Sequence, residues 1–421
     1  MFETFKKAWK VPEIRSKILF TLFIVLIFRI GCAIPVPGVD ISVVKNSVGE
    51  SSFLGLFNVL TGGAFEQFAI FALGITPNIN ASIIIQLLTM VIPSLENLAK
   101  EGEEGRKKIA KITRYVTLAL ALLIAVGSTL GMRNALRSNN FVTYLFIILT
   151  LTAGSMFTMW LGELMTDKGI GNGISMLIFV GIVSRIVPSI VSLCANVSAK
   201  SLGWWWLPII AIGVVLIIAA IVFMDGGERR IPVNYAKKVV GRKVYGGQST
   251  HIPMKLNPSG VLPIIFAISI TSMPTLIASW VPNTGFANWV NAYMGTKSLL
   301  YIIFYPLLII FFAFFYTTMS FNPIEVSKNL KENGGFVLGI RPGKPTSDYL
   351  SRILNRLTFA GSIFLAIIAL LPVLLGLINP ALSGLAIGGS SVIILVNVAL
   401  ETSSQLESMM LMRHYKGFLK A

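Results

Sequence analysis

The chain has 421 residues, of which 54% are hydrophobic and only 13% are charged. A soluble domain carries roughly 25% charged residues, so this composition excludes a fully water-exposed surface and predicts that lipid covers much of the molecule. The formal net charge is +17, but the basic residues lie between apolar blocks, which favours membrane orientation over nucleic-acid binding. Two cysteines and two histidines form no metal-binding pattern, so neither a metal nor a cofactor is expected.

Ten apolar segments are long enough to form a membrane-spanning helix, which needs about 20 residues. The first segment follows a basic N-terminus and lacks a small-residue cleavage site, so we expect it to be a retained span and not a signal peptide. The predicted spans are 18–36, 70–92, 112–131, 141–165, 172–194, 205–224, 259–281, 299–320, 353–378 and 381–404.

The connections between these segments differ in charge. Most of the 35 Lys and Arg residues lie in the N-terminal segment, the C-terminal tail and every second connection. Basic connections stay on the cytoplasmic side of a membrane, so this distribution predicts a multi-pass protein with both termini in the cytoplasm. That orientation requires an even number of spans, which agrees with ten.

Ten spans divide into an N-terminal half, residues 1–200, and a C-terminal half, residues 201–421. Five spans per half force the halves into opposite orientations, so any internal repeat is inverted. The second span of each half opens with Gly-x-x-Pro, at Gly74–Pro77 and at Gly260–Pro263. Glycine permits a break and proline suits a first helical turn. Interrupted spans at corresponding positions point to the path of the substrate.

The segment from Phe53 to Phe68 is apolar but too short to cross a membrane, and Gly62-Gly63 interrupts it. One interpretation is a helix at the membrane surface. The other is a re-entrant segment buried in protein, since unpaired backbone cannot face lipid. A buried segment with a glycine hinge could act as a movable stopper.

Two cytoplasmic connections, at about 225–258 and 321–352, are long and basic. Their charge fits attraction to anionic lipid, or docking of a large acidic partner such as ribosomal RNA or a soluble motor. The stretch Gly241–Leu256 within the first connection mixes glycine, aromatic and alternating residues, which predicts an ordered hairpin.

The span centres lack the ionisable pairs that ion and solute transporters use, and no Walker motif is present. These features favour a passive conduit, with no enzyme activity. A secondary transporter with inverted repeats is the alternative, and a lipid scramblase or insertase without a sealed pore is a third reading. Uncharged polar residues inside the spans, such as Asn80 and Thr271, fit either helix–helix hydrogen bonds or a partly wet contact between helices that separate.

Segments spread along the chain resemble the SecY family, the central channel subunits of the bacterial Sec protein translocase. They are FRIGCAIPVPGVD (Phe28 to Asp40), FALGITPNINASIIIQLL (Phe71 to Leu88), EGEEGRKKIAKITRY (Glu101 to Tyr115), MWLGELMTDKGIGNGIS (Met159 to Ser175), ERRIPVNYAKK (Glu228 to Lys238), QSTHIPMKLNPSGVLPIIFA (Gln248 to Ala267), FNPIEVSKNLKENGGFVLGIRPG (Phe321 to Gly343) and GGSSVII (Gly388 to Ile394).

The resemblance implies an all-α polytopic membrane protein whose ten transmembrane helices form two inverted pseudo-symmetric halves of five around a central hourglass pore. It implies a channel that passes unfolded secretory polypeptides across the bacterial plasma membrane and releases membrane segments sideways into lipid. An aliphatic ring would form the constriction, giving a sliding chain no fixed hydrogen bonds and resisting wetting when empty. The ring residues implied by the motifs are Ile75, Ile79, Ile174, Ile178, Ile265 and Ile394.

The resemblance also assigns the remaining segments. The stretch 53–68 corresponds to the plug, with Phe53, Leu54, Leu56, Phe57, Gly62 and Gly63. The second and seventh spans correspond to the lateral gate, with Pro77, Asn80, Gln86, Asn172, Pro263 and Thr271. The cytoplasmic loops correspond to the docking surface for the ribosome and the SecA motor ATPase, with Arg229, Arg230, Lys237, Lys238, Arg242, Lys243 and Arg341. SecE- and SecG-type small subunits, signal-bearing polypeptides and the lipid bilayer are the other implied partners.

Overall fold

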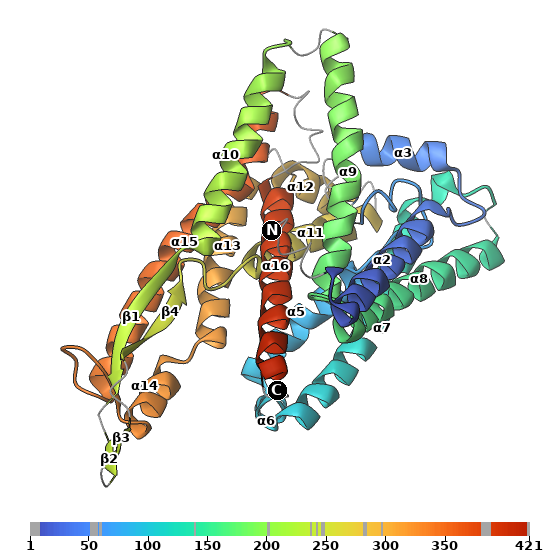
Figure 1. Cartoon of the computed structure of the whole chain (residues 1–421). Coiled ribbons are helices and arrows are strands. Elements are labelled where there is room, and N and C mark those ends of the chain that lie inside the picture. Colours follow the sequence, from blue (N-terminus) through green and yellow to red (C-terminus); the bar gives the residue numbers. More distant parts are fainter. Residues whose placement is uncertain are drawn as a thin grey trace.

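A computed structural model describes residues 9–50, 58, 61–138, 140–199, 203–235, 238–240, 243–245, 249–280, 284–295, 298–379 and 389–418. Most of these residues are helical (Figure 1). The helices are α2 (Pro12–Ala33), α3 (Ile41–Glu50), α5 (Thr76–Val91), α6 (Pro93–Lys100), α7 (Glu103–Gly131), η1 (Arg133–Ala135), α8 (Phe141–Lys168), α9 (Gly173–Ser198), α10 (Trp206–Gly226), α11 (Leu262–Trp280), α12 (Gly285–Tyr293), α13 (Leu299–Ser320), α14 (Pro323–Glu332), α15 (Lys344–Ile378) and α16 (Gly389–Phe418). The strands are β1 (Glu228–Tyr235), β2 (Lys238–Val240), β3 (Lys243–Tyr245), β4 (Ser249–Lys255) and β5 (Gly335–Val337).

Seven helical stretches within the described residues are long and apolar enough to cross a membrane. They contain α2, α7, α8, α9, α10, α13 and α15, which match the first, third to sixth, eighth and ninth predicted spans. The seventh predicted span is the shorter apolar helix α11. The beginning of the predicted span 381–404 lies outside the described residues, and α16 supplies the rest. The total of ten spans stays a prediction.

The second predicted span, 70–92, differs from a single straight helix. Residues 70–75 form turns, the helix α5 begins only at Thr76, and the chain then bends by 102° into α6. The bend lies at Ile92, whose backbone is extended because it precedes Pro93. This span is therefore shorter than the sequence predicts.

The segments that lead into α5 and α11 have the same local structure. Gly74 has a φ of 52° and Gly260 a φ of 61°, so both occupy the left-handed region that favours glycine. Pro77 and Pro263 each stand second in the helix that follows. The Gly-x-x-Pro pattern therefore produces a sharp turn before the helix at corresponding places in the two halves.

Figure 1 shows the helices of the two halves on different sides of the molecule, with α16 between them. The helices α2, α7 and α8 lie on one side, and α10, α13 and α15 lie on the other. The helix α10 has Ile221 as its one buried residue, so much of its apolar surface is available to lipid.

The two long basic connections, which the sequence predicts to be cytoplasmic, fold together instead of forming separate loops. The strand β1 pairs in antiparallel register with β4 from its own connection and with β5 from the other. Alternate residues of β1, Ile231 and Val233, point into an apolar core that also contains Leu330 of α14 and Leu350 of α15. The predicted hairpin at Gly241–Leu256 is wrong in its pairing: β3 pairs with β2, and β4 pairs with β1. The predicted loop 321–352 also ends early, because α15 begins at Lys344.

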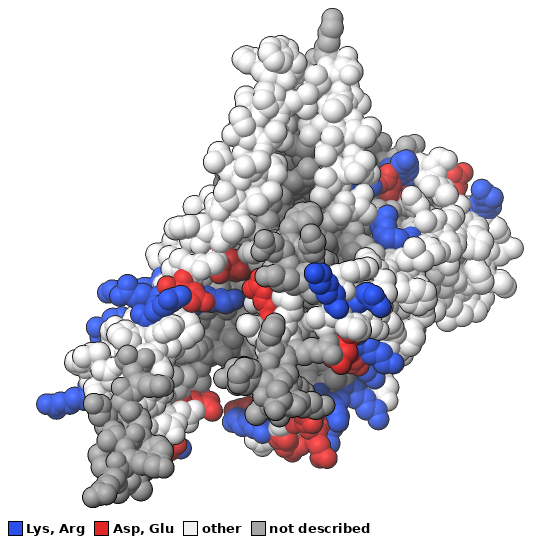
Figure 2. All heavy atoms as spheres, in the orientation of Figure 1, with Lys and Arg blue, Asp and Glu red and all other residues white. Residues whose placement is uncertain are grey.

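Charged side chains are distributed unevenly between the sheet region and the apolar helices. Figure 2 shows Lys and Arg gathered over the sheet formed by β1, β4 and β5 and near α6 and α7, while the visible faces of α9 and α10 are uncharged. The apolar helices and the basic sheet region therefore suit different surroundings, lipid for the first and water for the second.

Candidate functional site

The six isoleucines of the predicted ring belong to one apolar cluster. They come from four places in the chain: Ile75 and Ile79 at the start of α5, Ile174 and Ile178 on α9, Ile265 on α11 and Ile394 on α16. Ile75, Ile178 and Ile394 are buried, and the other three are half-buried. Elements of both halves therefore bring aliphatic side chains to one point.

The cluster is tightly packed on the α8 side. A Cβ atom added at Gly162 of α8 would lie 3.2 Å from Ile174 Cγ1 and 3.5 Å from Ile75 Cδ1. Glycine at this position lets α8 approach these two isoleucines closely. Aliphatic side chains offer dispersion contacts but no hydrogen bonds, so this cluster has no fixed partner for a polar group.

The predicted plug segment lies only partly within the described residues. Phe53, Leu54, Leu56 and Phe57 lie outside them, whereas Gly62 and Gly63 lie inside. The described part contacts two apolar clusters: Ala64 and Ala69 belong to the cluster that contains the isoleucines, and Phe65 and Phe68 belong to a neighbouring cluster with residues of α7 and α8. Most residues of the described part are buried in protein, which agrees with the re-entrant interpretation.

Gly62 makes a close backbone contact with α9. Its φ is 67°, and a Cβ added to it would lie 2.7 Å from the Cα atom of Gly181. Arg29 of α2 donates from Nη1 to the carbonyl oxygen of Gly62 (3.2 Å) and to Ser184 Oγ (2.9 Å), and the Ser184 hydroxyl itself lies 3.2 Å from the same carbonyl. In this structure Gly62 is a packing contact, and its role as a hinge stays a prediction.

A second polar group lies beside this contact. Glu66 accepts a hydrogen bond from Arg185 Nη1 of α9 (2.9 Å) and another from Asn58 Nδ2 (2.8 Å), both on Oε2. Lys45 Nζ of α3 lies 3.7 Å from its other carboxylate oxygen. The sequence analysis assigned no role to Arg29, Asn58, Glu66, Ser184 or Arg185. The signal available was an arginine within each of two otherwise apolar spans.

The predicted gate helices α5 and α11 meet through apolar side chains. Ile83 of α5 and Phe266 of α11 are buried in one cluster with Phe312 of α13. The polar residues assigned to the gate do not bond across it: Thr271 donates to the carbonyl of Ala267 in its own helix (2.8 Å). In α5, Asn80 Oδ1 and Gln86 Oε1 are buried without a hydrogen-bond partner.

Asn172, which the resemblance assigns to the gate, has a different role in this structure. Its side-chain oxygen accepts from the backbone N–H groups of Ile174 (3.1 Å) and Ser175 (3.3 Å), so it caps the N-terminus of α9. The cap orients the first turn of α9, which carries Ile174. Asn172 therefore supports the isoleucine cluster, whatever it contributes to a gate.

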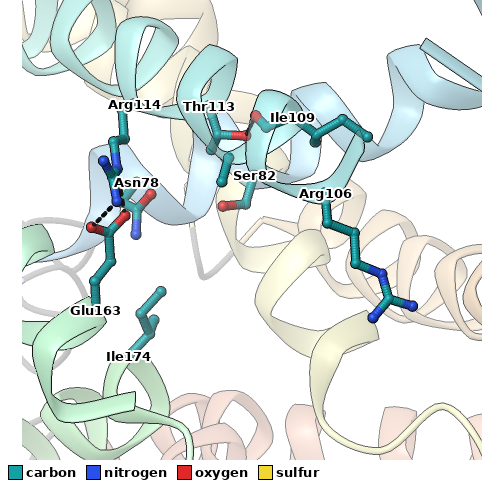
Figure 3. A pocket seen from close by; sticks show the side chains of 9 residues that line it. Asn78, Ser82, Arg106, Ile109, Thr113, Arg114, Glu163 and Ile174 are labelled. Carbon is teal, nitrogen blue, oxygen red and sulfur yellow. Dashed lines mark hydrogen bonds and ion pairs between the residues drawn. The ribbon is translucent and has the colours of Figure 1, made fainter. Parts of the chain in front are cut away.

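A cavity of about 290 Å³ lies between α5, α7, α8 and α9, next to Ile174 (Figure 3). Arg114 of α7 forms a bidentate pair with Glu163 of α8, with Nε–Oε1 at 2.9 Å and Nη2–Oε2 at 2.8 Å. This pair joins two helices of the first half beside the cluster. Paired guanidinium and carboxylate groups of this kind fix orientation more than they contribute stability.

The predicted docking residues that the structure describes lie in the strands and turns of the two basic connections. Arg229 and Arg230 on β1 are exposed, and Arg341 is exposed in the turn between β5 and α15. Lys238 and Lys243 lie in the short strands β2 and β3. Lys237 and Arg242 lie outside the described residues. The structure thus gathers positive charge from both connections around one folded unit.

The comparisons with known proteins agree on one family. The family model described as SecY matches residues 69–403. A protein translocase subunit SecY of Streptomyces galbus is 45% identical over 442 residues, covering 100% of both chains.

Solved structures give the same result for the fold. A structure described as a protein conducting channel has a TM-score of 0.67 at 20% identity and covers 94% of this chain and 92% of its own. Sec61 in a canine ribosome–channel complex has a TM-score of 0.61 at 18% identity, with coverage of 94% and 92%. The full-length match to the translocase subunit and the family model over most of the chain show that this protein belongs to the SecY family.

Proposed function

We propose that this chain is the subunit of a bacterial protein translocase that forms the channel for unfolded secretory polypeptides. The observation that carries this proposal is the convergence of six isoleucines from α5, α9, α11 and α16 in one apolar cluster. Family membership supplies the class of substrate, and the cluster supplies a constriction of suitable chemistry. The protein is a multi-pass membrane protein.

The proposed constriction acts through the absence of directional bonds. A translocating chain presents backbone N–H and C=O groups and side chains of every kind, and an aliphatic ring binds none of them for long. When the channel is empty, the same ring resists filling by water and so limits the passage of ions. A channel of this kind needs no bound cofactor, because the pull or push on the chain comes from a partner.

The proposed lateral gate is the contact between α5 and α11. Ile83 and Phe266 meet there as apolar surfaces, and lipid can replace such a contact without an unpaired polar group. The unpaired oxygens of Asn80 and Gln86 gain water if the helices separate. Both features lower the cost of opening toward lipid, which suits the release of membrane segments and the binding of signal sequences.

The proposed docking surface is the basic sheet region, with Arg229, Arg230 and Arg341 exposed on it. Positive charge on a folded platform suits ribosomal RNA or an acidic motor surface, and one solved neighbour is a channel bound to a ribosome. SecE- and SecG-type subunits and a SecA-type motor complete the proposed set of partners. The charge distribution of the chain supports cytoplasmic positions for this surface and for both termini.

Site-specific cross-linking tests the proposed constriction. Cysteines are introduced separately at Ile79 and Ile265, in a chain whose native Cys32 and Cys194 are replaced by serine, and a secretory polypeptide carrying one cysteine is stalled in the channel. We expect both positions to form a disulfide with the stalled chain. A cysteine at Leu216, exposed on α10, is the control and should not react.

If neither Ile79→Cys nor Ile265→Cys captures the stalled chain while the channel still transports protein, the path does not pass through this cluster. Capture at Leu216→Cys alone would place the path outside the ring altogether. Either result would contradict the proposed constriction.

A further inference from the structure

The described part of the plug segment, Asn58 together with residues 61–68, is here called the plug root. We propose that an ion pair between Glu66 of the plug root and Arg185 of α9 anchors the plug root in the resting channel, and that this pair sets how tightly the channel is sealed. This inference rests on the proposed channel function. It adds positioning residues that hold the seal.

The plug root is closed on itself around Asn58. The Asn58 carbonyl oxygen accepts from the N–H of Gly63 (2.8 Å), and its side-chain Oδ1 accepts from the N–H of Glu66 (3.0 Å). Its Nδ2 donates to the Glu66 carboxylate (2.8 Å). Asn58 is 2% exposed. These three bonds hold the Glu66 side chain in one orientation relative to the rest of the root. A displacement of Glu66 would therefore move the whole root.

Glu66 points its carboxylate toward Arg185. The side chains of Glu66 and Arg185 are 19% and 26% exposed, and the Nη1–Oε2 distance is 2.9 Å. Partial burial removes much of the water that would screen the pair, so the loss of one partner leaves a charge without compensation. The Nε of Arg185 is buried without a partner, so this guanidinium depends on Glu66 for its interaction with a carboxylate.

Neighbouring contacts bind the root to the same helices. Gly62 packs against the backbone of Gly181 on α9, and its carbonyl accepts from Arg29 of α2. All these partners lie on α2, α3 and α9, in the first half of the chain. The gate contact at α5 and α11 lies between the halves. The root therefore stays with α9 when the halves separate, unless the ion pair and the glycine contact also break.

The experiment uses the channel purified from membranes with the subunits that accompany it, reconstituted into planar bilayers. The variants are Glu66→Gln, Arg185→Gln and the charge-exchanged double variant E66R/R185E. The control is Lys45→Gln, because Lys45 is 65% exposed and lies 3.7 Å from Glu66. Resting ion conductance without substrate reports the seal, and transport of a secretory protein in vesicles reports the channel function.

Each single variant should raise the resting open fraction about tenfold, which corresponds to about 1.4 kcal/mol of closed-state stability. Lys45→Gln should leave the conductance close to that of the unmodified protein. The double variant should return the conductance toward the unmodified value, since it restores the pair with its charges reversed. A role in folding alone would lower the amount of assembled channel without this recovery.

An unchanged resting conductance in both single variants would overturn the anchor. So would a raised conductance that the charge-exchanged variant does not lower. Transport of the secretory protein distinguishes these results from a failure of the proposed function: transport that continues with unchanged conductance rejects the anchor alone, whereas transport absent from the unmodified protein rejects the channel.

Discussion

The plug root and the gate contact lie close to the same isoleucine cluster but differ in chemistry. The root is held by two arginines, a carboxylate, an asparagine and a glycine–glycine contact. The gate contact between α5 and α11 is held by apolar side chains and leaves polar oxygens unpaired. Directional bonds fix one arrangement, whereas apolar contacts can be exchanged for lipid at little cost. The two regions therefore differ in the way that the proposed gate and the proposed anchor require: the first contact is apolar and exchangeable, and the second is fixed by directional bonds.

The largest effect is expected from locking the gate contact. Cysteines at Ile83 and Phe266, in a chain without its native cysteines, are joined by a short thiol-specific cross-linker. Because the proposed gate must separate to admit a signal sequence, transport of a secretory protein should fall almost to zero and recover when a cleavable linker is cut. The two single-cysteine variants serve as controls. Full transport in the cross-linked protein would show that α5 and α11 need not separate.

A moderate effect is expected from crowding the plug root. In Gly62→Ala the new methyl group would meet the Gly181 backbone, and the left-handed φ adds strain. The root should be displaced from α9, and the resting conductance in planar bilayers should rise. Gly102→Ala is a matched control, because Gly102 also has a left-handed φ but has no atom within 4 Å of the added Cβ. Equal conductance in the two variants would contradict the proposed role of the close contact.

The smallest effect is expected from removing an unpaired oxygen at the gate. Asn80→Leu replaces a buried, unbonded side-chain oxygen and should stabilise the closed contact by about 1–3 kcal/mol, seen as a higher thermal unfolding midpoint and slower transport. Asn78→Leu is the control, because Asn78 Oδ1 accepts a hydrogen bond from Thr117 (3.3 Å). That variant should not gain stability. A lower midpoint for Asn80→Leu would mean that Asn80 already has a partner in the membrane.

The apolar segments could be predicted well because hydropathy over about 20 residues is a local property of the sequence. Helix ends were predicted less well where charged residues continue a helix beyond the membrane: α7 begins at Glu103, whereas the predicted span begins at residue 112. The second span was predicted to begin too early because residues 70–75 are apolar although they form turns. The same difference between local and distant features applies to the candidate site. The family motifs supply the six isoleucines, but Glu66 and Arg185 are 119 residues apart in sequence, and no local pattern connects them.

The sheet formed by β1, β4 and β5 has a consequence for the proposed lateral gate. The strand β1 follows α10 directly, β4 leads into α11, and β5 lies between α14 and α15. The link from β4 to α11 is itself stiffened, since Asn257 Nδ2 donates to the carbonyl of Gly260 (3.2 Å) and the Ser259 hydroxyl donates to Asn257 Oδ1 (3.2 Å). The proposed docking surface is therefore connected by a short, hydrogen-bonded link to α11, which is one side of the proposed lateral gate.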